Sequence, residues 1–322
     1  MRVYELAPFG EPPEAVEYDH LPFDVDTKSA IYLPGMHCPE CNDPNHYRGY
    51  YACAMDLPFA LSRRQRAKVK ALIDSYRPRA LPGFEGIQTS VPVLLPEDFS
   101  ALARDLRRLL GIPPHFFIRP HARVGPKRVY LLDEVTWDIR VHAGDMYLSR
   151  RGAKALWRSG LKGFALFPME VELGDEEMIT DCMWVELELS GQLERHREWW
   201  YRRKVMPLYE LVVWGRGGIP KTDPDGFWWQ CKRCKRWYLG KYQEYRLELD
   251  SQQWDGSDFF HFAECGNVHV TERAKEWLEN LGLVKWVGFI SPRPGSFWDE
   301  ISAQSAHRDF MLKQFGSDAG GT

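Results

Sequence analysis

The sequence predicts an α+β protein with mixed sheets and short flanking helices. Three observations indicate this class: short apolar segments that alternate as strands do, intervening segments with helical spacing, and one stretch that occurs twice. The first copy, Met146–Phe167, reads MYLSRRGAKALWRSGLKGFALF, and the second, Val268–Phe289, reads VHVTERAKEWLENLGLVKWVGF. The two align without a gap at an offset of 122 residues, which predicts two related modules.

Each copy has the pattern of a strand followed by a helix. Apolar residues alternate at its start, and Ser149 or Thr271 then stands where a helix N-cap accepts a hydrogen bond from an unpaired backbone N–H. Apolar residues with helical spacing come next. They are Ala274, Trp277, Leu278 and Leu281 in the second copy and, in a weaker pattern, Ala153, Leu156 and Trp157 in the first.

The end of each copy predicts a helix stop and a returning strand. Gly160 and Gly282 stand just after the helices, where a left-handed residue is favoured. The apolar runs Phe164–Phe167 and Trp286–Phe289 then predict the second strand. The sequence therefore predicts a strand–helix–strand module that is used twice, and neither copy contains a catalytic motif.

Other segments predict the elements around these modules. Gly215–Gly226, which reads GRGGIPKTDPDG, is rich in glycine, proline and aspartate and predicts a linker. We therefore expect an N-terminal half over residues 1–214, the linker over 215–226, a C-terminal half over 227–312 and a disordered tail over 313–322. We expect strands at Ala30–Leu33, Arg128–Val141, Met178–Leu189 and Val205–Trp214, and helices at Ser62–Arg77, Asp98–Leu110 and Ser296–Leu312.

The composition is that of a globular protein without a membrane span. Of the 322 residues, 44% are apolar and 27% are charged, and no run approaches the 18 apolar residues of a spanning helix. The formal charge of −3 is too close to neutral to indicate nucleic acid or an anionic membrane as a partner. Because the first residues lack the basic and apolar regions of a secretory signal, we expect a cytoplasmic protein. The sequence indicates no oligomeric state.

Four of the seven cysteines form two C-x-x-C pairs, Cys38–Cys41 and Cys231–Cys234. In a chain without an export signal, this pattern indicates metal or redox chemistry rather than a disulfide framework. Thioredoxin-type redox chemistry needs a helix N-terminus at the pair, whereas a turn and a strand are predicted here. Two such knuckles supply the four sulfurs of a tetrahedral zinc site. We therefore predict a structural zinc ion bound by Cys38, Cys41, Cys231 and Cys234 in a zinc-ribbon-like element.

Two alternatives to a shared zinc site remain open at this point. In the first, either pair binds no metal; in the second, each pair completes a separate site with neighbouring residues. The candidates for such separate sites are His37, His46 and Cys53 for the first pair, and His261 and Cys265 for the second. Cys182, in an apolar segment, is predicted to be an ordinary buried thiol.

Catalytic patterns are missing, and a nucleic-acid site has only local support. The ten histidines form no H-E-x-x-H motif, and neither G-x-S-x-G nor a paired-carboxylate signature occurs, so we expect no enzymatic activity. The alternative function is that of a zinc-ribbon protein that binds nucleic acid or regulates. Basic and aromatic residues interleave around the second pair, as phosphate contact and base stacking require. They are Lys232, Arg233, Lys235, Arg236 and Trp237.

Several parts occur in an order that is more specific than either cysteine pair alone. They are LPGMHCPEC at Leu33–Cys41, a further cysteine in Tyr51-Ala52-Cys53, the first module, the second C-x-x-C pair, and a closing segment at Asp258–Phe289. This order resembles the double-CXXCG-motif paralogous family of myxobacteria, the Sit-type immunity proteins of contact-dependent toxin exchange. The resemblance implies a protein that neutralises a cognate polymorphic or contact-dependent bacterial toxin by stoichiometric binding.

The chain departs from the family pattern after each knuckle, where Asn42 and Lys235 replace the motif glycine. Asparagine tolerates the left-handed backbone that such a turn often needs, but lysine does so less well. The substitution at Lys235 therefore predicts a second knuckle that is either distorted or metal-free.

Overall fold

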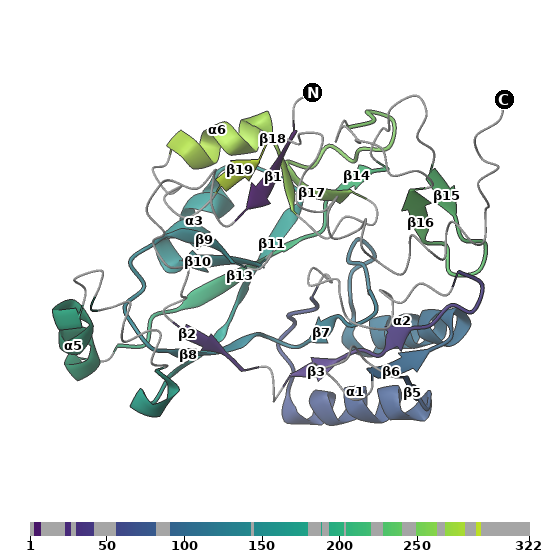
Figure 1. The fold of residues 1–322 in the computed structure, drawn as a ribbon, viewed down its shortest axis with the longest axis horizontal. Coiled ribbons are helices and arrows are strands. Elements are labelled where there is room, and N and C mark those ends of the chain that lie inside the picture. The colour runs from purple at the N-terminus through teal and green to yellow at the C-terminus, as the bar shows by residue number, and fades with distance from the viewer. Residues whose placement is uncertain are drawn as a thin grey trace.

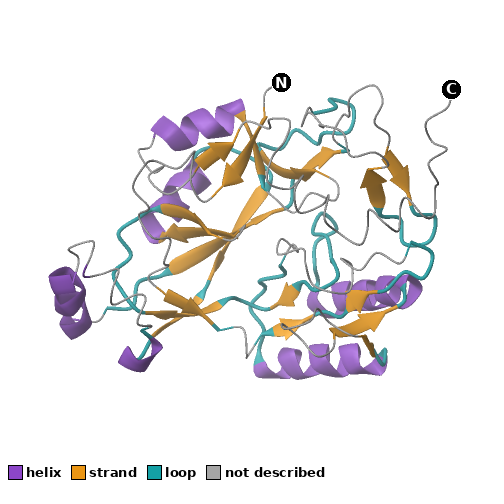
Figure 2. Ribbon diagram, in the orientation of Figure 1, coloured by secondary structure: helices purple, strands orange, loops and turns teal. Residues whose placement is uncertain are grey.

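The computed structural model confirms the α+β class, with short helices beside several small sheets (Figures 1 and 2). Among the helices that it describes, none is both long and apolar enough to cross a bilayer. The structure describes residues 3–7, 23–26, 30–41, 56–81, 91–142, 145–179, 188, 193–202, 204–219, 228–239, 249–262, 268–280 and 288–290.

The first of two central sheets contains the first predicted module. Its strand order is β11-β13-β10-β9, and all neighbours are antiparallel. Helix α3 (Arg150–Arg158) connects β10 to β11 and packs against β10 and β13. The strands are β9 (Ile139–His142), β10 (Asp145–Ser149), β11 (Phe164–Pro168) and β13 (Leu208–Val213).

The second central sheet contains the second module and repeats this arrangement. Its strand order is β19-β1-β18-β17, again antiparallel, and β14 (Arg216–Gly218) adds a parallel strand beside β17. Helix α6 (Glu272–Asn280) follows β18 and packs against β18 and β1. The four repeated strands are β1 (Val3–Ala7), β17 (Phe259–Phe262), β18 (His269–Thr271) and β19 (Gly288–Ile290). The predicted strand–helix–strand module is therefore confirmed in both places.

The register shows that the central strands β13 and β1 correspond as well. Ser149 lies opposite Leu208, and the equivalent Thr271 lies opposite Val3. Counting on from these two pairs aligns Leu208-Tyr-Glu-Leu with Val3-Tyr-Glu-Leu, so the same tripeptide occupies the middle strand of both sheets. Strands β9 and β17 correspond in the same way. Ile139 pairs with Leu148 and Phe259 pairs with Val270, and Leu148 and Val270 are equivalent at the 122-residue offset. The repeat is thus longer than the stretch recognised in the sequence.

The two copies exchange their central strands. In chain order, unit 1 consists of β1, the first cysteine pair, β9, β10, α3 and β11, and unit 2 consists of β13, the second pair, β17, β18, α6 and β19. Strand β1 nevertheless lies in the sheet of unit 2, between β18 and β19, and β13 lies in the sheet of unit 1 (Figure 1). Strand β1, from the predicted half 1–214, therefore lies in the same sheet as β17, β18 and β19 of the predicted half 227–312.

The inner faces of both sheets and both module helices form one core. In this cluster, Leu156 of α3 and Leu278 of α6 occupy equivalent positions and are buried. Trp157 is the exception to the predicted apolar face, because its side chain is 74% exposed. The core includes Leu6, Ile139, Met146, Leu148, Ala153, Leu161, Leu211, Phe259, Val270 and Ala274.

Both module helices begin with the same polar contacts, in which a hydroxyl bonds both a backbone N–H of its helix and an aspartate; we call this arrangement the latch. Ser149 Oγ accepts a hydrogen bond from the Gly152 N–H at 3.1 Å and donates one to Asp138 at 2.7 Å. Thr271 Oγ1 makes the equivalent contacts, with the Ala274 N–H at 3.3 Å and with Asp258 at 3.0 Å. These contacts confirm both predicted N-caps and add an aspartate to each copy of the repeat.

The helix stop of the first copy is also confirmed. Gly160 has a φ of +72°, and Leu161 beyond it is buried, as the capping pattern requires. At the start of the helices, Arg151 and Arg273 are the second residues of α3 and α6. They form ion pairs with Asp138 and Asp258, respectively. Gly282 and Leu281 lie outside the described residues.

A second core forms around helices α1 and α2, which pack against each other. Helix α1 (Arg63–Ser75) begins at a capping box made by Ser62 and Gln65, and α2 (Pro96–Leu110) ends at Gly111, whose φ is +65°. Both agree with the predicted helices at 62–77 and 98–110, although α2 starts two residues earlier because Pro96 is favoured in a first turn. The remaining elements are β2 (Phe23–Val25), β3 (Ile31–Tyr32), β4 (Gly35–Met36), β5 (Arg79–Leu81), β6 (Val91–Leu94), β7 (Arg123–Val124), β8 (Arg128–Leu131), β12 (Glu170–Leu173), η2 (Glu176–Met178), α5 (Leu193–Arg202), β15 (Trp228–Gln230) and β16 (Trp237–Leu239).

Three predicted segments differ from the structure. The expected strand at 128–141 is two strands, because β8 and β9 belong to different sheets. The expected strand at 178–189 begins as the short helix η2, and residues 180–187 lie outside the described part. Within the expected linker, residues 216–218 form β14, since the backbone there pairs with the edge strand β17. The predicted terminal helix at 296–312 and the tail at 313–322 lie outside the described residues.

Candidate metal centre

The first cysteine pair follows a short strand that is fixed by its neighbour. Strand β4 runs parallel to β6, and the His37 N–H donates a hydrogen bond to the Leu94 carbonyl at 2.9 Å. A tight turn then brings Cys38 and Cys41 to one side, and both are buried. The β4–β6 pairing therefore presents the two thiols on a rigid support.

The second pair occupies the tip of a hairpin. Strands β15 and β16 are antiparallel, and Cys231 lies directly after β15. The Cys231 N–H donates to the Arg236 carbonyl at 2.8 Å, and the Lys235 N–H donates to the Cys231 carbonyl at 2.9 Å. Lys235 closes this turn with a φ of +61°. The predicted distortion is therefore wrong: lysine adopts the left-handed conformation, at a cost of about 1–2 kcal/mol, and the turn keeps its hydrogen bonds.

The structure brings the two pairs together into one cluster. The four sulfur atoms all lie within 4.8 Å of one another. Cys38 Sγ is 3.8 Å from Cys231 Sγ, and Cys41 Sγ is 3.7 Å from Cys234 Sγ. Zinc–sulfur bonds of about 2.3 Å give tetrahedron edges of about 3.8 Å, so these separations suit four thiolates around one ion. They are far longer than the sulfur–sulfur bond of a disulfide, which is about 2.05 Å.

The burial of the four cysteines favours a bound cation beside their thiolates. Three of the four cysteines are buried, and Cys234 is partly buried. Burial raises the pKa of the Cys38 thiol, and a hydrogen bond with Cys41, together with burial, raises that of Cys234. Thiolates in such a place need a positive charge beside them, which a divalent metal supplies. The donor set and its geometry therefore fit a metal ion.

An ion pair joins the second knuckle to the core that supports the first. Arg233 Nε donates to Glu97 Oε1 at 2.8 Å, at the start of α2. The hydrogen bond from Arg233 holds the pKa of Glu97 below its usual value. Cys234 also packs against the α1–α2 core. The knuckles are thus held together by contacts beyond the sulfur atoms.

The other candidate ligands do not join this cluster. His37 and His261 are described, but neither belongs to the cysteine group, which is the sole cluster of at least three possible metal ligands found in the described ranges. His46, Cys53, Cys182 and Cys265 lie outside the described residues. The described residues thus favour the shared site over two separate ones.

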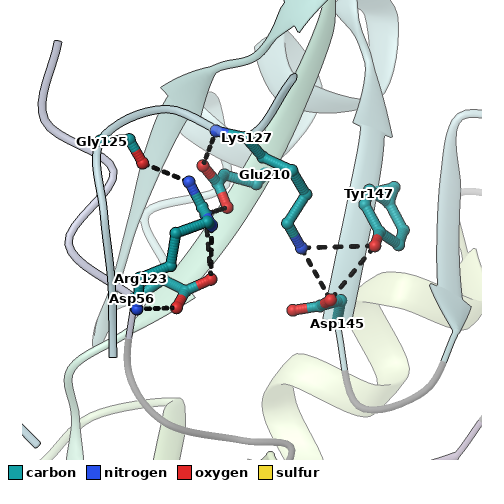
Figure 3. Close-up of polar contacts among 7 residues, drawn as sticks. All are labelled: Asp56, Arg123, Gly125, Lys127, Asp145, Tyr147 and Glu210. Atoms are coloured by element: carbon teal, nitrogen blue, oxygen red, sulfur yellow. Dashed lines mark hydrogen bonds and ion pairs between the residues drawn. The ribbon is translucent and has the colours of Figure 1, made fainter. Parts of the chain in front are cut away.

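A second polar cluster, the buried ion network drawn in Figure 3, is not predicted by any sequence pattern. At one end, the Arg123 guanidinium lies between Asp56, at 2.9 Å, and Glu210, at 2.5 Å. The side chains of Arg123 and Glu210 are almost fully buried. Arg123 also donates to the Gly125 carbonyl. Its pKa rises because the two carboxylates outweigh the effect of burial, so the guanidinium stays charged.

The other end of the network is built on Lys127. Its ammonium group lies 2.7 Å from Asp145 and 3.3 Å from the Tyr147 hydroxyl (Figure 3). Burial would lower the pKa of Lys127, but Asp145, Tyr147 and Glu210 raise it above its usual value, and burial raises that of Tyr147. Lysine and tyrosine both hold their protons at neutral pH, as in a structural ion pair. The members are scattered from residue 56 to residue 210, so no local motif indicates them.

Comparison of the chain with protein-family models, with curated proteins and with solved structures finds no match. The site is therefore interpreted from its own geometry and from the resemblance in motif order.

Proposed function

We propose that the protein binds one zinc ion through its four clustered cysteines and neutralises a cognate protein toxin by stoichiometric binding. The observation that carries the metal part is the sulfur cluster, in which each unit of the duplicated chain supplies two thiolates. A tetrahedral set of four sulfurs suits zinc or iron. Zinc is the proposed ion because closed four-cysteine sites of this kind are typical of structural zinc.

The proposed zinc has a structural role. With sulfur at all four positions, no position is left for a water molecule or a substrate, as catalytic zinc requires. The ion instead joins unit 1 to unit 2, next to the Arg233–Glu97 ion pair. In this proposal the metal stabilises a binding scaffold and takes no part in chemistry.

The toxin part of the proposal draws its partner class from the motif order that resembles the Sit-type immunity family. The structure is compatible with a binder: the buried ion network of Figure 3 holds its charges in fixed pairs, with lysine protonated rather than available as a base. We place the activity in the cytoplasm, where an immunity protein meets a toxin that has entered or is being made.

Co-expression tests this function. The protein encoded immediately upstream is the candidate toxin, and it is expressed in a sensitive host with and without this chain. Restored growth together with co-purification of the two proteins supports stoichiometric neutralisation. Growth arrest that this chain does not relieve, with no co-purification, contradicts it.

The alternative function, nucleic-acid binding at the second knuckle, has less support from the structure. Arg236 is buried, and Arg233 is held by Glu97, which leaves Lys232 and Lys235 as exposed cations. A nucleic-acid complex loses affinity steeply as salt rises, because counterions are released on binding. Salt-sensitive binding to mixed DNA or RNA that Lys232→Ala and Lys235→Ala abolish would favour this alternative.

A further inference from the structure

The duplication provides an internal comparison between helices α3 and α6. Both follow the same latch, pack on the same two strands of their sheets and bury an equivalent leucine, Leu156 or Leu278. Their buried sides are alike because they meet one core. Their outer sides are free to differ, since packing does not fix them. Any systematic difference there therefore points to a role other than folding.

The outer side of α3 is basic and carries an exposed tryptophan. We call the exposed residues Arg150, Lys154, Trp157 and Arg158 the α3 face. Trp157 is 74% exposed, although burying an indole is strongly favourable. Helix α3 contains no acidic residue, in a chain whose formal charge is −3.

The equivalent residues of α6 have the opposite character. At the 122-residue offset, Arg150, Lys154 and Trp157 correspond to Glu272, Glu276 and Glu279. The scaffold thus accepts glutamate at all three positions. The cations and the indole of the α3 face are therefore not required by the helix, its cap or its core.

One arginine is shared by both helices, and its role explains why it is shared. Arg151 pairs with Asp138, and Arg273 pairs with Asp258. The α3 face has no such partner: among the described residues, no carboxylate lies within ion-pair distance of Arg150, Lys154 or Arg158. The arginine used for folding is common to both copies, and the cations without a carboxylate partner are confined to α3, because Arg273 and Lys275 of α6 are both paired.

We propose that the α3 face is a docking surface for an acidic patch on a partner protein, with Trp157 as the anchor residue that becomes buried in the complex. This inference rests on the proposed function and assigns the surface that the toxin contacts. Tryptophan and arginine are the residues most enriched among interface positions that dominate binding energy. Three unpaired cations around the indole select an acidic partner surface by charge complementarity.

A protein fits this surface better than a nucleic acid does. The nine-residue helix is about 14 Å long, which gives few phosphate contacts for a chain that is acidic overall. A single exposed indole in a basic ring suits one hydrophobic recess on an acidic protein. Nucleic-acid binding is kept as an outcome of the test.

The test replaces three residues of the α3 face, in the full chain, with the equivalent residues of α6. The variant Arg150→Glu, Lys154→Glu, Trp157→Glu carries residues that the equivalent helix already tolerates, so it is expected to fold and to keep its thermal unfolding temperature. Its matched control is Glu276→Lys, the reverse exchange at an exposed position of α6. Each protein is titrated against the upstream-encoded candidate toxin, and rescue of growth is scored in parallel.

We expect the triple variant to lose roughly 100-fold in affinity and to lose rescue, while the control binds as wild type does. If the triple variant binds and protects as wild type does, the docking surface is wrong and the immunity function stands. If the wild-type chain neither binds nor protects, the proposed function fails, and this surface fails with it. If wild type binds mixed-sequence RNA or DNA in a salt-sensitive way that the triple variant abolishes, the face binds nucleic acid and the protein-docking proposal is overturned. If the triple variant unfolds at a markedly lower temperature, single substitutions Trp157→Glu and Lys154→Glu repeat the measurement, and wild-type affinity in both overturns the proposal.

Discussion

The two central sheets agree on one face and differ on the other. Tyr147 of the first sheet and His269 of the second occupy the same position, because each lies opposite the glutamate of a Tyr-Glu-Leu strand. Tyr147 belongs to the buried ion network with Lys127, whereas His269 stacks on Phe260 with ring centroids 6.0 Å apart. Tyr147 also packs edge-on against Phe23, so one strand framework accommodates a buried ion network beside aromatic contacts in one copy and aromatic packing around a histidine in the other.

The difference shows that burial by one shared core constrains residue type more than strand pairing does. The inner faces of both sheets meet in a single cluster, where Leu6 and Leu211 hold equivalent places. The outer faces are covered by unrelated segments. Arg123 and Lys127 lie against the first sheet there, whereas Leu249 and Trp254 pack on Phe260 and Phe262 of the second. Each outer face thus follows the chemistry of the segment that packs on it.

The largest expected effect comes from breaking the ion network of the first sheet. Glu210→Ala leaves Arg123 buried without its closest carboxylate, and we expect a loss of about 3–5 kcal/mol in the free energy of unfolding. Urea unfolding measures it. The control Glu276→Ala, at an exposed position of α6, is expected to change stability by about 0.5 kcal/mol or less. Equal small losses in both variants would show that the network does not stabilise the fold.

The next effect concerns the latch of α3. Burial would raise the pKa of Asp138, but hydrogen bonds from Arg151 and Ser149 lower it below its usual value of about 4. The ionised carboxylate therefore adds stability at pH 7, and this contribution is lost as pH falls below about 4 toward the lowered pKa.

Asp138→Asn should accordingly destabilise the protein by about 2 kcal/mol at pH 7 and by clearly less at pH 3. Urea unfolding at the two pH values measures the gap between variant and wild type. A gap that stays constant or widens on acidification would contradict the assignment of Asp138 as an ionised latch.

The caps provide a smaller and symmetrical test. Ser149→Ala and Thr271→Ala each remove the side-chain oxygen that accepts a hydrogen bond from the backbone N–H of the third residue of its helix. We expect each to lower the free energy of unfolding by about 1 kcal/mol, because the two residues have the same role in the two copies. Losses that differ by several-fold in thermal or urea unfolding would mean that the copies are not equivalent at the latch.

The last effect is of similar size and has the opposite sign. Lys235 holds a φ of +61° at the second knuckle, a conformation that glycine adopts without strain. Lys235→Gly should therefore raise stability by about 1 kcal/mol without changing the metal content. A clear loss of stability would show that the lysine side chain itself supports the knuckle.

Local patterns allowed much of the fold and the candidate site to be predicted. The two modules, their N-caps and the four cysteines each depend on residues a few positions apart, where periodicity and capping chemistry operate. The C-x-x-C spacing also indicates metal chemistry without reference to the fold. The structure confirms the two modules and their N-caps, and it brings the four cysteines into one cluster that could hold a metal ion.

The rest depends on contacts that no local pattern encodes. The Tyr-Glu-Leu strands are too short to be recognised as a repeat, and only the register relates Tyr4 to Tyr209. The strand exchange follows from pairing between distant segments, as does the Arg123–Glu210 pair. The exposed position of Trp157 contradicts its helical spacing, because the apolar stripe of this nine-residue helix is narrower than the pattern predicts.

The most direct test of this account is the metal content of purified full-length protein and of two single variants, Cys38→Ser and Cys231→Ser, measured by elemental analysis. One zinc per chain in wild type, lost in both variants, is the result that a site shared by the two units predicts. Two zinc ions per chain, one of which each variant retains, or no bound metal in the wild-type protein, would contradict it.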